Sequence, residues 1–107
     1  MMMTKNEELK KWDPINYMET EEDMIAYLSA ALEDGDTQVI SAALGDVARA
    51  KGIGSVSEKS GLSRTSLYKS LSKTGNPQLS TFLEVIKALN FKLELVSQEK
   101  KDFSISR

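Results

Sequence analysis

Hydroxyl and lysine side chains recur on one side of a short helix that the sequence predicts from residue 64 to about residue 72. At about 100° per residue, the positions opposite its inward-facing leucines carry Thr65, Lys69 and Ser72. Short polar groups of this kind can hydrogen-bond to base edges, and lysines can meet phosphates. The residues predicted to contact double-stranded DNA are Ser55, Ser63, Arg64, Thr65, Ser66, Tyr68, Lys69, Ser72 and Lys73.

The charge around this helix agrees with a nucleic-acid partner. Residues 44–76 carry six basic and two acidic side chains, although the whole chain has a formal net charge of −2. Arg64 falls in the first turn of the predicted helix, the part of a recognition helix that usually enters the major groove. In the alternative interpretation, Ser63 only caps the helix, the lysines are solvated, and Tyr68 is a partly buried ring.

Two short helices joined by a tight turn must position these side chains. A helix-turn-helix needs a small residue where its helices cross, a glycine in the turn and an apolar residue after it. Ser57, Gly61 and Leu62 stand at those positions. Glycine suits the turn because a left-handed conformation costs it little. The first short helix is predicted over residues 55–60.

Three longer helices are predicted around this pair. Thr20 and Gly35 fit the N-cap and the C-terminal stop of the first helix. Asp36 fits the N-cap of the second helix. The third helix spans about residues 81–89, with Ser80 as its cap.

The C-terminal part of the chain differs in periodicity. Apolar and polar residues alternate over residues 91–95, which predicts a short β-strand. A single strand leaves backbone groups unpaired, so pairing with a second copy of the chain is one solution. The alternative is a short extended tail that lies on the helices. The residues predicted to form a homodimer contact are Phe91, Leu93 and Leu95.

The charge is divided unequally along the chain. Residues 1–36 hold ten acidic and three basic side chains (−7), and residues 37–107 hold six acidic and eleven basic (+5). Such asymmetry favours two surfaces with different partners. The alternative is a solvated acidic helix beside an ordinary domain. We predict an acidic N-terminal arm and helix over residues 1–36, a helix-turn-helix domain with a C-terminal strand over 37–96, and a flexible tail over 97–107.

The composition argues against catalysis. The chain has no cysteine and no histidine, which removes the commonest general base and the usual transition-metal ligands. The cluster Glu21, Glu22 and Asp23 fits a helix N-terminus electrostatically without any catalytic role. We therefore predict no enzyme activity, no cofactor, no metal and no small-molecule substrate. Because no segment resembles a signal peptide or a membrane span, we also predict no membrane partner and a cytoplasmic location.

Several stretches of the chain resemble a known family. They are Asp13-Pro14, TEEDMIAYL at 20–28, LGDVARAKG at 44–52, GLSR at 61–64, LYKSLS at 67–72 and GNP at 75–77. Over roughly residues 12–96 the chain is similar to the addiction-module antidote proteins, which are HigA-like antitoxins of the Xre-type helix-turn-helix class. It departs from that class at Ser57 and Ser60, where alanine or another small apolar residue is usual, and at Asn90, where the family tends to glycine.

This resemblance implies an all-α, five-helix, lambda-repressor-like domain that neutralises a small mRNA-cleaving toxin of the RelE/HigB type and represses its own operon. A toxin that handles RNA would be basic, and the acidic N-terminal part of this chain could meet it. The predicted toxin-binding residues are Trp12, Tyr17, Glu21, Glu22 and Tyr27.

Two other functions fit much of the same pattern. The first is a stand-alone phage-like transcriptional regulator without a toxin. The second is a protein-binding module that kept the fold but lost DNA binding.

Overall fold

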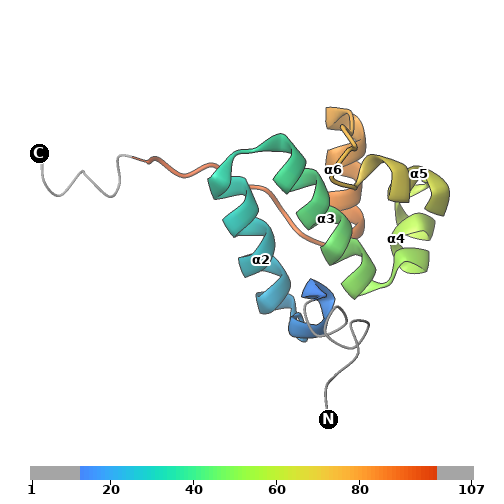
Figure 1. The fold of residues 1–107 in the computed structure, drawn as a ribbon, viewed down its shortest axis with the longest axis horizontal. Coiled ribbons are helices and arrows are strands. Elements are labelled where there is room, and N and C mark those ends of the chain that lie inside the picture. Colours follow the sequence, from blue (N-terminus) through green and yellow to red (C-terminus); the bar gives the residue numbers. More distant parts are fainter. Residues whose placement is uncertain (1–12, 99–107) are drawn as a thin grey trace, which may run out of the picture.

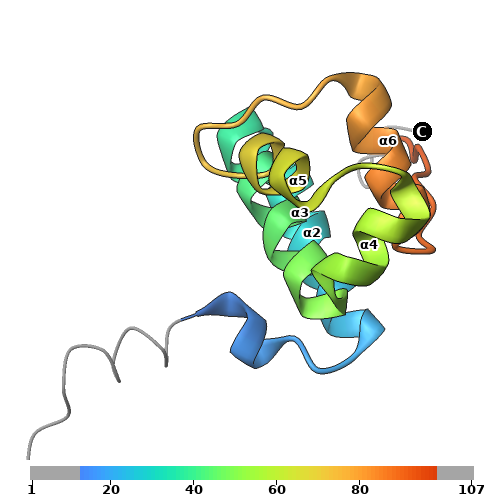
Figure 2. The same cartoon turned by 90° about the vertical axis from the view of Figure 1, so that its right-hand side faces the viewer.

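Helix α3 (Thr37–Lys51) runs through the middle of the computed structural model, which describes residues 13–98 (Figure 1). It contacts the 3₁₀ turn η1 and helices α2, α4 and α5, while α6 packs on α4. Helices α4, α5 and α6 lie on the right-hand side of the domain in Figure 1, and this side faces the viewer in Figure 2. The other elements are η1 (Pro14–Tyr17), α2 (Glu21–Asp34), α4 (Ile53–Ser60), α5 (Arg64–Ser70) and α6 (Leu79–Ala88).

Helix α2 has the two ends that the sequence predicts. The Thr20 hydroxyl accepts a hydrogen bond from the amide of Asp23 at 3.1 Å, and the Asp23 carboxylate accepts one from the amide of Thr20 at 3.1 Å. This reciprocal pair is a capping box. The pKa of Asp23 lies below its ordinary value because its carboxylate accepts hydrogen bonds from the amides of Glu19 and Thr20. Gly35 ends the helix with a φ of 84°, in the left-handed region. Asp36 caps α3, as predicted, through the amide of Gln38 at 2.8 Å.

The core draws on every α-helix of the domain. A helix of seven or eight residues is unstable alone, so α4 and α5 depend on this core. Each fully buried aliphatic side chain contributes about 1.5–3 kcal/mol. The largest side chains that are fully buried are Leu44, Val47, Val56, Leu67, Val85 and Leu89, and the buried residues Met24, Leu28 and Ala31 add the contribution of α2.

Serine hydroxyls hold the turn between α4 and α5. Gly61 adopts a φ of 78°, as the predicted turn requires. The Ser57 hydroxyl donates to the carbonyl of Leu62 at 2.6 Å, and the Ser60 hydroxyl accepts from the amide of Leu62 at 3.2 Å. These two serines therefore satisfy backbone groups of the turn that an alanine would leave to other partners.

Three predicted helix boundaries are wrong by about two residues. Helix α4 begins at Ile53 rather than Ser55, and α5 ends at Ser70 rather than about Ser72. Helix α6 begins at Leu79 with Gln78 in the N-cap position, so Ser80 lies inside the helix and does not cap it. Neither Gly52 before α4 nor Gln78 makes a side-chain cap, so neither start has the signal that marks α2 and α3.

The described N-terminal segment forms a turn. Asp13 is extended, as Pro14 requires, but Pro14–Tyr17 form one turn of 3₁₀ helix. The Asp13 carboxylate accepts from the amide of Ile15 at 3.2 Å and so caps the turn. Trp12 and residues 99–107 of the predicted tail lie outside the described residues.

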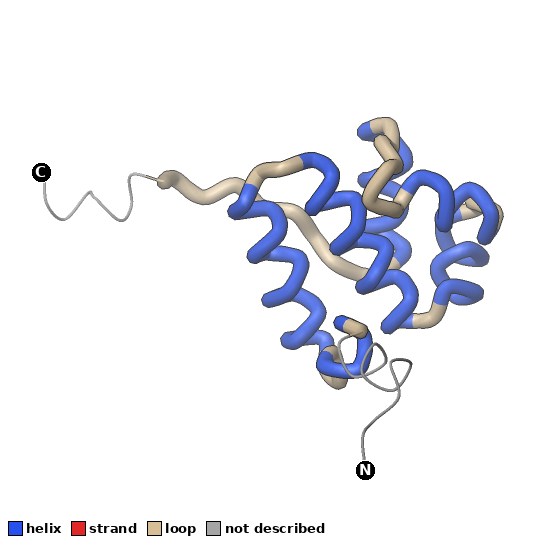
Figure 3. The backbone as a smooth tube through the Cα atoms, in the orientation of Figure 1, coloured by secondary structure: helices blue, strands red, loops and turns tan. Residues whose placement is uncertain are grey.

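The predicted strand at 91–95 is absent from the structure. Figure 3 shows helices and loops but no strand over residues 13–98. Asn90 follows α6 with a φ of 66°, so asparagine takes the left-handed conformation at the position where the family tends to glycine. The segment after it has no other strand within the described chain to pair with, so its alternation of apolar and polar residues does not produce a ladder.

The end of α5 touches the backbone of α3. A β-carbon added at Gly45 would overlap the carbonyl oxygen of Leu71, the residue that ends α5. Only glycine lets the two backbones approach this closely. Gly45 therefore sets the distance between the central helix and α5.

We expect Gly45→Ala to lower the free energy of unfolding by about 1–3 kcal/mol, because the new methyl group forces the two backbones apart. Urea denaturation followed by circular dichroism measures this. The matched control is Gly54→Ala, whose β-carbon would meet only the flexible end of the Arg64 side chain. Alanine is also the better helix former, so this control should be neutral or stabilising. Equal stability of Gly45→Ala and the wild-type protein would contradict the packing argument.

Candidate nucleic-acid interface

Helix α5 presents the face that the sequence predicts. Leu67 is buried at 1% exposure, whereas Tyr68 is exposed at 53%. Of the nine residues predicted to contact DNA, all are exposed except Ser72, which is half-buried. The structure therefore brings Arg64, Thr65, Ser66, Tyr68 and Lys69 together on one short exposed helix.

Arg64 lies at the start of α5 and reaches back over α4. A β-carbon built on Gly54 would come within 2.7 Å of the Arg64 guanidinium, so the absence of a side chain at Gly54 leaves room for this arginine. The sequence pattern does not reveal that role, because the predicted helix begins at residue 55, whereas Gly54 lies in the first turn of α4.

The Ser63 hydroxyl caps α5. It accepts a hydrogen bond from the amide of Ser66 at 3.0 Å. This confirms the capping role, and the hydroxyl hydrogen remains a donor for an incoming group. Ser55 lies on the exposed side of α4, near the start of that helix.

Ser72 and Lys73 lie beyond the end of α5, so helical periodicity does not determine which way their side chains face. The Ser72 hydroxyl donates to the carbonyl of Lys69 at 3.3 Å and lies 3.4 Å from the Thr74 hydroxyl. Its hydroxyl is thus already used within the chain. Lys73 is exposed in the loop that follows.

The basic side chains of residues 44–76 fall into two groups. Arg49 and Lys51 are held by acids of the same chain, with Lys51 Nζ 2.6 Å from a Glu21 oxygen. Lys59, Arg64, Lys69 and Lys73 form no ion pair with any residue of the described range 13–98. Of these four cations, Lys59 lies near the end of α4, and the other three lie on or just after α5.

Of the predicted toxin-binding residues, the four within the described range lie on η1 and the first half of α2. Tyr17 is exposed at 60%, and Glu22 is exposed. Glu21 is engaged by Lys51, and Tyr27 is half-buried. The structure thus holds Glu21 and Tyr27 in contacts within the chain and leaves Tyr17 and Glu22 exposed.

A polar network that the sequence analysis missed joins η1, α2 and α3. The Tyr27 hydroxyl donates to Asp46 at 2.7 Å, and Arg49 donates to Asp46 at 2.9 Å and to Asp13 at 3.3 Å. The hydrogen bond from Arg49, together with that from the amide of Ile15, holds the pKa of Asp13 below its ordinary value. Burial, followed by the bond to Asp46, raises the pKa of Tyr27. No spacing rule links these residues, since they lie on three different elements.

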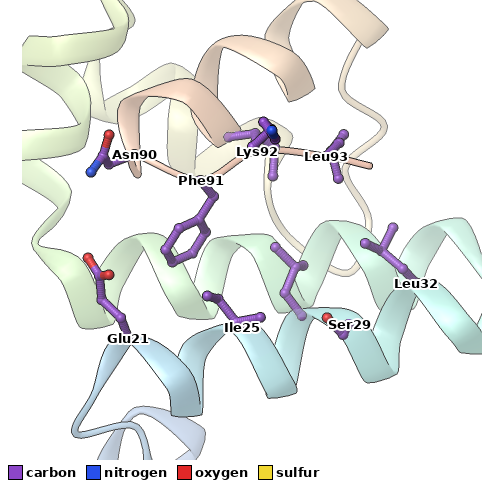
Figure 4. Close-up of a pocket in the computed structure, with 10 residues that line it drawn as sticks. Glu21, Ile25, Ser29, Leu32, Asn90, Phe91, Lys92 and Leu93 are labelled. Atoms are coloured by element: carbon purple, nitrogen blue, oxygen red, sulfur yellow. The ribbon is translucent and has the colours of Figure 1, made fainter. Parts of the chain in front are cut away.

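The residues predicted to form a dimer contact differ from one another in exposure. Figure 4 shows the Phe91 ring pointing toward α2, at one side of a hollow of about 240 Å³ between that helix and the C-terminal segment. Lys51 Nζ lies 5.3 Å from the centre of this ring, within cation–π range. Phe91 therefore packs within its own chain, whereas Leu93 and Leu95 are exposed at 44% and 98%.

Comparisons with known proteins identify the family. The family model described as "Probable addiction module antidote protein" matches residues 8–97. The chain belongs to this family. It is also 39% identical over 89 residues to an uncharacterized protein of Haemophilus influenzae, which covers 83% of this chain and 92% of that protein. No solved structure matches the chain.

Membership in this family implies a cognate toxin as partner, and such antidotes are typically not enzymes. Among residues 13–98, no three histidine, cysteine, aspartate or glutamate side chains lie close enough to hold a metal ion. Within the same range, no helix of this antidote is long and apolar enough to cross a membrane.

We expect Tyr27→Phe to lower the free energy of unfolding by about 1 kcal/mol at neutral pH, because the hydrogen bond to Asp46 is lost. The folded state keeps the Tyr27 proton above the ordinary tyrosine pKa of about 10, so this stabilisation is present below pH 10 and is lost as the pH rises above it. Urea denaturation at several alkaline pH values should therefore show a steeper loss of stability for the wild-type antidote than for Tyr27→Phe. The same pH dependence in both proteins would contradict this assignment.

Proposed function

We propose that this antidote is also a DNA-binding repressor of its own operon, with α4 and α5 as a helix-turn-helix and α5 as the recognition helix. The observation that carries the proposal is the exposed face of α5, on which hydroxyls and unpaired cations stand opposite the buried Leu67. In such motifs the recognition helix enters the major groove with its first residues on base edges.

The side chains on α5 divide into two kinds of contact. Arg64, in the first turn, can pair with two acceptors of a guanine, the commonest specific contact in the major groove. Lys69 and Lys73 lie nearer the other end and suit phosphates. Thr65 and Ser66 are short enough to reach base edges. Phosphate contacts would make the binding salt-dependent.

A homodimer would place two such helices in successive major grooves. Half-sites of a near-palindrome would then lie about one helical turn, roughly 10 base pairs, apart. Leu93, Leu95 and Val96 support a dimer contact through the C-terminal segment, because they leave a run of apolar side chains exposed.

The toxin of the proposed module is of the RelE/HigB type and is basic. Residues 13–36 contain eight acidic side chains and no basic one. Such a surface favours the approach of a cationic protein and disfavours DNA. Its charge supports η1 and α2 as the side on which the toxin binds.

We expect Lys69→Ala to weaken binding to the antidote's own upstream DNA in fluorescence anisotropy. If Lys69 meets a phosphate, the slope of log affinity against log salt should fall by about one; if it reads a base edge, one base preference should relax. Lys87→Ala, an exposed lysine on α6, is the matched control and should bind like the wild type. Unchanged affinity and salt slope for Lys69→Ala would remove this residue from the interface.

We also expect Leu95→Lys to convert the dimer into a monomer in sedimentation velocity, because it places a charge in the proposed apolar contact. Leu79→Lys is the control, since Leu79 is exposed at 71% but lies at the start of α6. A dimer that survives Leu95→Lys, or that is lost only in Leu79→Lys, would show that the C-terminal segment does not mediate dimerisation.

A further inference from the structure

All three tyrosines of the chain line two adjoining hollows. Tyr17 and Tyr27 line a hollow of about 370 Å³ beside η1. Tyr27 and Tyr68 line a hollow of about 600 Å³ between α3 and the end of α5. Pro14 and Tyr27 line both, so the two hollows lie side by side, and we call them together the tyrosine groove.

The tyrosine groove joins the two surfaces of the proposed function. Tyr17 and Tyr27 belong to the side proposed for the toxin, whereas Tyr68 and Lys73 belong to the side proposed for DNA. The larger hollow is lined by residues of both sides, namely Tyr27, Tyr68 and Lys73. A partner that fills this hollow from the Tyr27 side would contact the recognition helix as well.

The walls of the larger hollow suit an apolar side chain of a protein. Val39, exposed at 43%, lies there with Ala42 and the buried Leu71. Tyrosine rings around an apolar depression are typical of the centres of protein interfaces. DNA would find few donors there, and the Asp46 carboxylate in the hollow would repel phosphate.

The charged side chains around the two hollows indicate which kind of protein would bind there. Asp23 lines the smaller hollow and Asp46 the larger one, and the flanking helix α2 adds the acids of residues 13–36. Among residues 13–98, Lys73 is the one cation that lines either hollow. A basic protein is therefore the favoured occupant.

We infer that the cognate toxin seats an aliphatic or aromatic side chain in the tyrosine groove and covers Tyr68 and Lys73, so that toxin and DNA exclude each other on this antidote. This rests on the proposed function. It adds that the toxin contact extends from η1 and α2 onto the end of α5, and that free toxin would release the DNA.

The test uses the purified product of the gene adjacent to the one that encodes this chain as the probe. Val39→Arg fills the groove with a cationic side chain without altering α5, and it should weaken probe binding by about tenfold or more in calorimetry. Leu79→Arg is the matched control. Leu79 is exposed at 71%, begins α6 and lines neither hollow. It should bind the probe within about twofold of the wild type. Equal probe affinity for Val39→Arg and the wild type, or a loss confined to Leu79→Arg, would overturn the inference.

A competition experiment tests mutual exclusion. Wild-type antidote is bound to labelled upstream DNA, and the probe is then titrated in. The anisotropy should fall to that of free DNA; a rise to a stable ternary complex would overturn the inference and leave the proposed function standing. If the probe does not bind the wild-type antidote at all, the toxin half of the proposed function fails together with the inference.

Discussion

The close approach of α3 and α5 is the constraint on which the rest of the structure depends. Helix α5 has seven residues and cannot be stable alone. It is held by the burial of Leu67 and Leu71 and by the contact between the backbone of Leu71 and Gly45. The exposed side chains of α5 are thereby fixed relative to the core, which a surface that reads base edges requires.

A polar network holds the N-terminal segment against α3, the same central helix. Asp46 and Arg49 of α3 hold Tyr27 of α2 and Asp13 at the start of η1. The acidic side of the molecule is thus fixed against α3, and α3 also supports α5. The proposed toxin and DNA surfaces therefore share one rigid helix and meet at the tyrosine groove, so binding at one can affect the other without a large conformational change.

Local signals in the sequence predicted most of the helices, because caps and apolar periodicity act over a few residues. The capping box at Thr20, the cap at Asp36 and the turn at Gly61 are all confirmed. The starts of α4 and α6 were misplaced because neither has a side-chain cap. The prediction of a strand after Asn90 was wrong, because alternating apolar and polar residues form a strand only where a partner strand completes the hydrogen-bond ladder.

Contacts between distant residues carried no such local signal. The Tyr27–Asp46–Arg49–Asp13 network, the space at Gly54 for Arg64 and the tyrosine groove all depend on how the helices pack. For α5, by contrast, helical periodicity was enough to predict the exposed face up to Ser70. The same periodicity did not apply to Ser72 and Lys73, because the helix ends before them.

The central claim is that the exposed face of α5 binds DNA. A fluorescence-anisotropy titration of the wild-type antidote on its own upstream DNA and on scrambled DNA, at two salt concentrations, tests it most directly. The account predicts tighter binding to the upstream DNA and a loss of affinity at the higher salt concentration, as released counterions require. An absence of binding to either DNA at the lower salt concentration would contradict it and would leave α4 and α5 as a scaffold for protein partners alone.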